Sequence, residues 1–92
     1  MPRIYCSPTM GDAHIWVTKV TARGEADLLV HRVNDWGWAN RPWLWFMANK
    51  QDANVYVHFC SQGVAQLAVC FVDTYGQAGW VTKDHPCRRL LR

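Results

Sequence analysis

One short phrase occurs six times in this chain of 92 residues, and it constrains the fold more than any other feature. The phrase consists of a glycine or glutamine, a variable residue, an alanine and a small or polar residue, and an alternating apolar run follows it. The alanines are Ala13, Ala26, Ala39, Ala53, Ala65 and Ala78, which lie 13, 13, 14, 12 and 13 residues apart. A period this regular indicates that every copy has the same structural role.

The residues after each alanine alternate in the manner of a half-buried strand. Apolar residues stand two and four positions after the alanine, as in Ile15 and Val17 or in Leu67 and Val69. Period two predicts strands with one buried face. The third unit departs from this pattern because Arg41 and Pro42 stand where the first inward residue is expected, which predicts an irregular strand start or a bulge.

The phrase itself predicts turns. We expect positive φ at its glycines and burial of its alanines, and we expect the polar residue after the alanine to bind turn amides. The glycines are Gly11, Gly24, Gly37, Gly63 and Gly76, and Gln51 takes their place in the fourth unit.

The symmetry of the repeat favours a closed fold. In an antiparallel meander equivalent environments recur at every second strand, whereas here the phrase recurs at every strand. The bulky inward residues would not fit inside a narrow solenoid. The sequence therefore predicts an all-β, closed toroidal domain of about seven short strands over residues 1–82, with Arg3–Cys6 as the first strand and a basic tail over residues 83–92.

Two segments are similar to a known family. Arg23–Val30 (RGEADLLV) and Val72–Trp80 (VDTYGQAGW) resemble the repeats of the bacterial septoil-knot domain family, whose function is unknown. The resemblance extends from about Arg3 to Trp80. It implies a backbone tied into a seven-crossing torus knot, and it brings no catalytic or binding residues to this chain.

Composition and charge leave few functional classes. The net charge of +3 owes much to Arg88, Arg89 and Arg92 in the tail, which keeps a nucleic acid or another anionic surface open as an alternative partner. No apolar run is long enough to span a bilayer and no secretory signal is present, so we expect a cytoplasmic protein with reduced cysteines.

Candidate chemistry is sparse. His31, His58 and Cys70 share one position of the repeat, so a small metal-binding protein or enzyme is an alternative function if the fold brings these residues together to hold zinc. That position faces outward by the alternation. No catalytic or phosphate-binding motif occurs, and we expect neither a cofactor nor an enzyme.

The aromatic third unit is the best candidate for contact with a partner. Five large aromatic residues within Trp36–Phe46 exceed what one face of a strand can bury. We expect some of them to face solvent beside Arg41 and to bind a protein partner or a second copy of the chain. The candidate residues are Trp36, Trp38, Arg41, Trp43 and Trp45. The sequence thus predicts a small, non-catalytic binding or accessory module.

Overall fold

The computed structural model describes residues 2–82, 84–89 and 91, and it is all-β. No α-helix occurs among these residues, and the only helical segments are single 3₁₀ turns. None of the described helices is long and apolar enough to cross a membrane. The strands are β1 (Arg3–Cys6), β2 (Ile15–Lys19), β3 (Leu28–Val33), β4 (Leu44–Met47), β5 (Val55–Phe59), β6 (Leu67–Phe71) and β7 (Gly79–Trp80). The 3₁₀ turns are η1 (Met10–Asp12), η2 (Arg23–Glu25), η3 (Trp36–Trp38), η4 (Tyr75–Gln77) and η5 (Pro86–Arg89).

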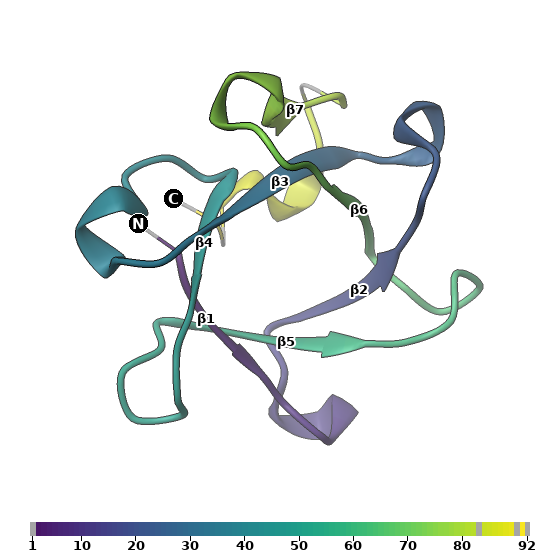
Figure 1. The fold of residues 1–92 in the computed structure, drawn as a ribbon. Helices are drawn as coiled ribbons and strands as arrows, with labels where there is room; N and C mark the ends of the chain where they lie inside the picture. The colour runs from purple at the N-terminus through teal and green to yellow at the C-terminus, as the bar shows by residue number, and fades with distance from the viewer. Residues whose placement is uncertain (1, 83, 90, 92) are drawn as a thin grey trace.

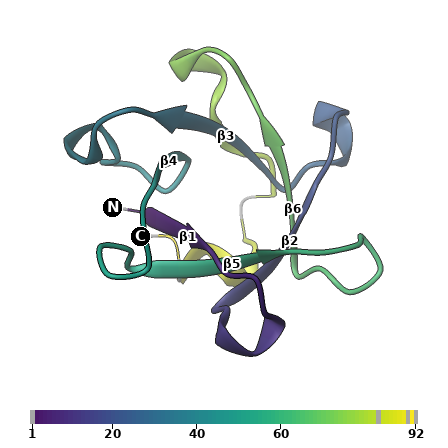
Figure 2. The ribbon, with the colours of Figure 1, turned by 60° about the horizontal axis from the view of Figure 1, so that its bottom comes forward.

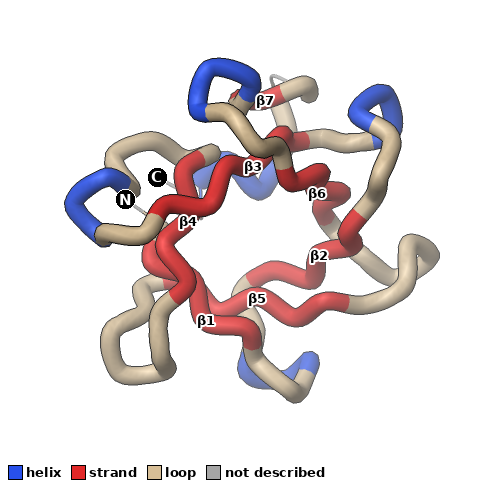
Figure 3. Tube along the Cα trace, in the orientation of Figure 1, coloured by secondary structure: helices blue, strands red, loops and turns tan. Residues whose placement is uncertain are grey.

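Six strands close into a barrel in the order β1, β5, β2, β6, β3 and β4, and β4 pairs again with β1. All six pairings are parallel, and β7 joins β3 as an antiparallel strand outside this ring. Figures 1 and 3 show the closed ring with its turns projecting outward. The predicted closed all-β arrangement is confirmed, and the parallel direction explains why the phrase recurs at every strand.

The chain passes around this ring twice. Strands consecutive in sequence are separated by one strand of the other circuit, because β5 lies between β1 and β2, and β6 lies between β2 and β3. Figure 2 shows β1 and β5, which belong to different circuits, lying side by side. The step from β3 to β4 is the exception, since these two strands are direct neighbours.

The barrel interior is filled by the alternating residues that the sequence predicted. Ile4 pairs with Val55, Val57 with Ile15, and Val17 with Leu67, so the register advances by two residues at each of these steps. Such a stagger tilts the strands and lets their inward side chains interdigitate. The core residues are Ile4, Ile15, Val17, Leu28, Val30, Trp45, Val55, Val57, Leu67, Val69, Cys87 and Leu91.

The irregular third unit starts its strand late. β4 begins at Leu44, five positions after Ala39, whereas β2, β3, β5 and β6 begin two positions after their alanines. β4 therefore pairs only with the second half of β3, from His31 onward. The first half of that edge is taken by β7, whose Gly79 and Trp80 pair with Leu29 and Leu28. The predicted irregularity thus lies at the strand start.

The expected positive φ at the phrase glycines is wrong. Among the described residues only Gly79 has a positive φ, and Gly79 follows the alanine instead of preceding it. Gly11, Gly24, Gly37 and Gly76 are the central residues of η1 to η4, whose backbone is right-handed. The alanine ends the turn, as where Ala26 N–H donates to Arg23 O at 3.2 Å. Ala26 and Ala39 are buried as expected, and the other four alanines are half-buried.

In four of the six units the polar residue after the alanine bonds to a neighbouring strand and not to turn amides, which corrects the sequence-based expectation. Gln66 N–H donates to Trp16 O at 2.7 Å, while Trp16 N–H donates to Gln66 Oε1 at 3.1 Å. Asn54 makes the same two bonds with Arg3. We call this reciprocal pair of hydrogen bonds the strand clasp. It occurs at His14 with Tyr56, Asp27 with Ala68, Asn54 with Arg3, and Gln66 with Trp16.

The C-terminal segment closes one end of the barrel. Cys87 and Leu91 are buried within the same hydrophobic cluster as the strands. The segment is held at the start of β3, where Val81 N–H and Thr82 N–H both donate to Asp27 O. Apolar burial and these bonds therefore fix the tail, drawn in yellow in Figure 1, to the domain that the repeat builds.

Candidate functional site

The tryptophans of the third unit have three different environments. Trp45 is fully buried, its Nε1–H donates to Pro42 O at 3.0 Å, and its ring packs edge-on against Phe71. Trp43 is half-buried and packs on the core. Trp38 is 64% exposed. A partner can therefore reach Trp38 directly on the folded barrel, and it cannot reach Trp45.

Two other candidates complete this unit. Arg41 is exposed, and its carbonyl accepts a hydrogen bond from Leu44 N–H at 3.1 Å, which sets the late start of β4. The backbone of Trp36 opens η3, and its side chain lies outside the described part of the chain.

Trp38 flanks an open groove over the end of β3. Tyr75, from η4 of the sixth unit, lies along the same groove and is 51% exposed. The two aromatic residues come from different circuits of the chain and line the same hollow at β3. The groove has a volume of about 460 Å³, and its lining is His31, Arg32, Val33, Asn34, Asp35, Trp38 and Tyr75. We call it the Trp38–Tyr75 groove.

The repeat explains why these two side chains face solvent. Trp38 takes the variable position of the phrase, where other units have Asp12, Glu25 or Asp52, all of which are exposed. Tyr75 stands before the glycine, at a position that is also exposed in Arg23. The core requires no aromatic residue at either position. Sequence reasoning missed Tyr75, although comparison of equivalent positions in the six units would have found it.

The three residues of the zinc alternative are engaged in separate contacts. His31 Nδ1 lies 3.1 Å from Val72 O, and His58 Nδ1 lies 2.9 Å from Ser7 O. Because a carbonyl can only accept, both Nδ1 atoms carry the hydrogen in these contacts. Cys70 Sγ lies 3.8 Å from Thr21 O. Across residues 2–82, 84–89 and 91, no three His, Cys, Asp or Glu side chains form a group that could hold a metal ion.

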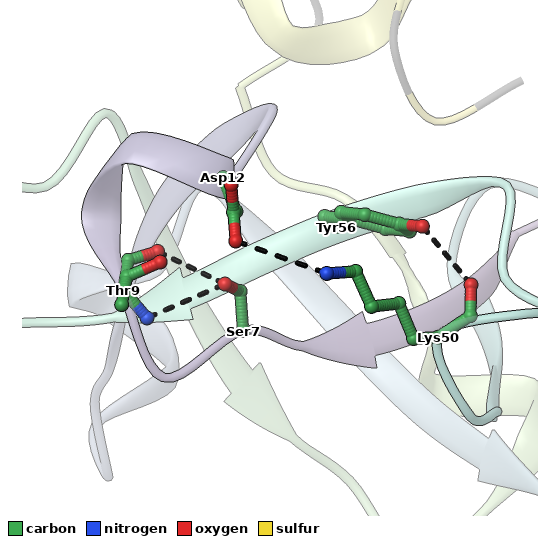
Figure 4. Close-up of polar contacts among 5 residues, drawn as sticks. All are labelled: Ser7, Thr9, Asp12, Lys50 and Tyr56. Atoms are coloured by element: carbon green, nitrogen blue, oxygen red, sulfur yellow. Dashed lines mark hydrogen bonds and ion pairs between the residues drawn. The ribbon is translucent and has the colours of Figure 1, made fainter.

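The acidic residues of the phrase lie on exposed turns. Asp12 Oδ2 is 4.0 Å from Lys50 Nζ, and both side chains are 59% exposed. Figure 4 shows this pair next to Tyr56, whose hydroxyl donates to Lys50 O at 3.0 Å, and next to the Ser7 hydroxyl, which donates to Thr9 O. An exposed ion pair of this kind contributes little to stability. It links the turn regions of the first and fourth units.

The basic tail presents two described arginines. Arg88 and Arg89 are exposed on η5, and the Arg88 guanidinium lies 5.6 Å from the centroid of the Trp80 ring. Arg92 lies outside the described residues. Burial raises the pKa of the Cys87 thiol, and the negative charge of Asp27 raises it further. The tail is thus anchored through its apolar residues, while its arginines face outward.

Comparison with known families gives one match. The family model of the 7(1) septoil knot domain matches residues 1–81. The chain belongs to the septoil knot domain family. Neither the curated proteins nor the solved structures contain a match to it. In this septoil knot domain the matched region ends just before the tail that packs Cys87 and Leu91 into the barrel.

Proposed function

We propose that this septoil knot domain is a non-catalytic binding module, and that a protein partner docks in the Trp38–Tyr75 groove. The observation that carries the proposal is the exposure of two aromatic side chains on one groove, at repeat positions where the core requires none. Trp, Tyr and Arg are the residues that most often dominate binding energy at protein interfaces. Arg32 also lines this groove.

The shape and chemistry of the groove favour an extended protein segment. Val33 and the two aromatic rings provide apolar contact, while Asn34 and Asp35 provide polar groups at the same hollow. An apolar side chain of the partner would insert between Trp38 and Tyr75. The rigid barrel supports this arrangement, because β3 is paired on both sides and its inward residues are buried.

A peptide-display selection against the folded domain tests the proposal. Enriched peptides are then titrated by calorimetry into the wild type and into Trp38→Ser, Tyr75→Ser and Val64→Ser. Val64 is the matched control, because it takes the position of Trp38 in the fifth unit and is 50% exposed. We expect Trp38→Ser to weaken binding about 30-fold, which is typical of a buried tryptophan anchor, and Val64→Ser to leave it unchanged.

Two results would overturn this proposal. Peptides that bind Trp38→Ser as tightly as the wild type would place the binding surface elsewhere. Sedimentation equilibrium tests whether a second copy of the chain occupies the groove. If the wild type dimerises and only Trp38→Ser and Tyr75→Ser are monomeric, the groove binds a second copy and not an extended segment.

A further inference from the structure

The inward alternation of each strand continues one residue beyond the core, to the open end of the barrel. Val17 is buried and Lys19 follows it on the same face of β2, and Arg32 follows the buried Val30 on β3 in the same way. All six strands of the barrel are parallel, so these residues gather at one end of the ring. We call this end the barrel mouth, and its residues are Cys6, Lys19, Arg32, Met47, Phe59 and Phe71.

Contacts among these side chains show that they converge. Lys19 Nζ lies 5.6 Å from the centroid of the Phe71 ring, and the Arg32 guanidinium carbon lies 5.3 Å from the same centroid. Phe59 packs against Phe71 with its ring centroid 6.4 Å away. Two cations, from the strands on either side of β6, thus approach the same aromatic ring.

Neither cation is neutralised by an acid within the described residues. The ion pairs there are Lys50 with Asp12 and His85 with Asp27, and neither Lys19 nor Arg32 has a carboxylate within ion-pair distance. Both side chains are exposed. Asp73 lines the hollow that Arg32 and Phe71 share, and it is the one acidic residue of that lining. The mouth therefore combines two positive charges that have no carboxylate partner among the described residues with the aromatic ring of Phe71.

The thiol of Cys6 lies on the same face of the ring. Cys6 follows the buried Ile4 on β1 and is exposed at the strand end. Burial raises the pKa of this thiol, and the positive charge of Arg32 acts against the rise. Cys6 is consequently a built-in chemical reporter of the electrostatics of the mouth.

We propose that the barrel mouth binds a small anion through Lys19 and Arg32, with a phosphate or carboxylate group of the ligand held between the two cations above Phe71. This site shares Arg32 with the Trp38–Tyr75 groove and differs from it in Lys19, which does not line that groove. Charge-assisted hydrogen bonds from lysine and arginine are the usual means of holding such groups. At the end of the barrel closed by Cys87 and Leu91, Arg88 and Arg89 line a different hollow, which they share with the carboxylate of Asp84.

The rate of alkylation of Cys6 by an anionic reagent, relative to that by a neutral reagent, measures the electrostatic potential at the barrel mouth. The rates with iodoacetate and with neutral iodoacetamide are compared, and peptide mass mapping assigns them to Cys6. The same thiolate attacks both reagents and iodide leaves in both reactions. A change in the pKa of the thiol or in its accessibility therefore affects both rates equally and cancels in their ratio. We expect Lys19→Gln and Arg32→Gln each to lower the iodoacetate-to-iodoacetamide ratio about two- to threefold. Arg23→Gln, an exposed change of the same charge on η2, should leave the ratio unchanged.

Ligand protection supplies the second measurement and distinguishes the two sources of the anionic group. Pyrophosphate and glutarate are added separately, and we expect at least one of them to slow alkylation of Cys6 by the neutral reagent. Protection should weaken in Lys19→Gln and strengthen in Asp73→Asn. A rate ratio that is equal in the wild type, Lys19→Gln and Arg32→Gln would overturn the proposal, as would the absence of protection by both anions. Peptide binding to the Trp38–Tyr75 groove should survive Lys19→Gln, so the two proposals can fail independently.

Discussion

Asp27 is the residue at which the strand clasp and the tail meet, and its substitution tests both. Its Oδ2 accepts a hydrogen bond from Ala68 N–H at 3.0 Å, and its Oδ1 accepts one from the Thr82 hydroxyl at 3.0 Å. His85 Nε2 lies 3.4 Å from Oδ2, and the His85 ring stacks on Trp80. One carboxylate therefore joins β6, β3 and the segment that closes the barrel.

The expected cost of Asp27→Ala follows from these contacts. Hydrogen bonds to a charged acceptor contribute about 1.5–3 kcal/mol each, and the contacts to Thr82 and His85 are partly exposed and count for less. We expect a loss of about 3 kcal/mol in the free energy of unfolding, which lowers Tm by about 12–24 °C in a domain of this size. Asp27→Asn keeps an oxygen for Ala68 N–H, as Asn54 does for Arg3, and should lose only about 1 kcal/mol.

Equilibrium unfolding in urea, followed by tryptophan fluorescence in both the unfolding and refolding directions, measures these differences. Glu25→Ala is the matched control, because Glu25 is an exposed acid two residues earlier on η2. The reasoning is refuted if Asp27→Ala is as stable as Glu25→Ala. It is also refuted if Asp27→Asn is destabilised as strongly as Asp27→Ala, since the clasp would then not depend on the acceptor oxygen.

Three further substitutions test other parts of the structure. Gly76→Ala should stabilise the domain by about 0.4–1 kcal/mol, because Gly76 does not have positive φ and a Cβ there would meet nothing within 4 Å; a lower urea midpoint would contradict this. Because burial raises the pKa of Cys87 above its usual 9.0, the thiol stabilises the folded state below that pH and loses this contribution as pH rises through the folded value. The stability difference between wild type and Cys87→Ala should therefore shrink as the pH rises above 9.0, and a constant difference in urea unfolding would exclude this linkage. Replacing Arg88 and Arg89 together by Gln leaves the anchoring Cys87 and Leu91 in place, so reduced retention on heparin at low salt would support the anionic-surface alternative and unchanged retention would remove it.

The sequence predicts the ring because its signals are local and repeated. Period two places Ile15 and Val17 inside, and recurrence of the phrase at every strand requires equivalent strands, which a closed parallel barrel provides. The strand at Arg3–Cys6 followed from its distance to Ala13, and the structure confirms it.

The features that sequence reasoning missed depend on partners far away in the chain. Gln66 Oε1 accepts a hydrogen bond from Trp16 N–H, and the two residues are 50 positions apart in the sequence. The residues near Gln66 in the sequence therefore could not predict the strand clasp. Leu91 stands outside the repeat, and its burial became visible only with the barrel present. The barrel mouth could have been predicted from the sequence. Lys19 and Arg32 stand six residues after Ala13 and Ala26, so the alternation places these charged residues on the same face as the core residues.

The irregularity of the third unit follows from the number of strands. A chain that advanced two places at every step around a ring of six would return to its first strand after three strands and could not build the other three. One step must be odd, and the chain takes it between β3 and β4, where Arg41 and Pro42 delay the strand.

The tryptophans of the third unit differ in their relation to this odd step. Trp45, fully buried, and Trp43, packed on the core, belong to the unit that makes the odd step, and their packing accounts for them. Trp38 precedes that irregularity, at a position where four of the other units have an exposed polar residue and the fifth unit has the exposed Val64. Neither the winding of the chain nor the filling of the core requires a tryptophan there. Among the tryptophans whose side chains are described in this unit, Trp38 is therefore the one to which we assign contact with the proposed partner.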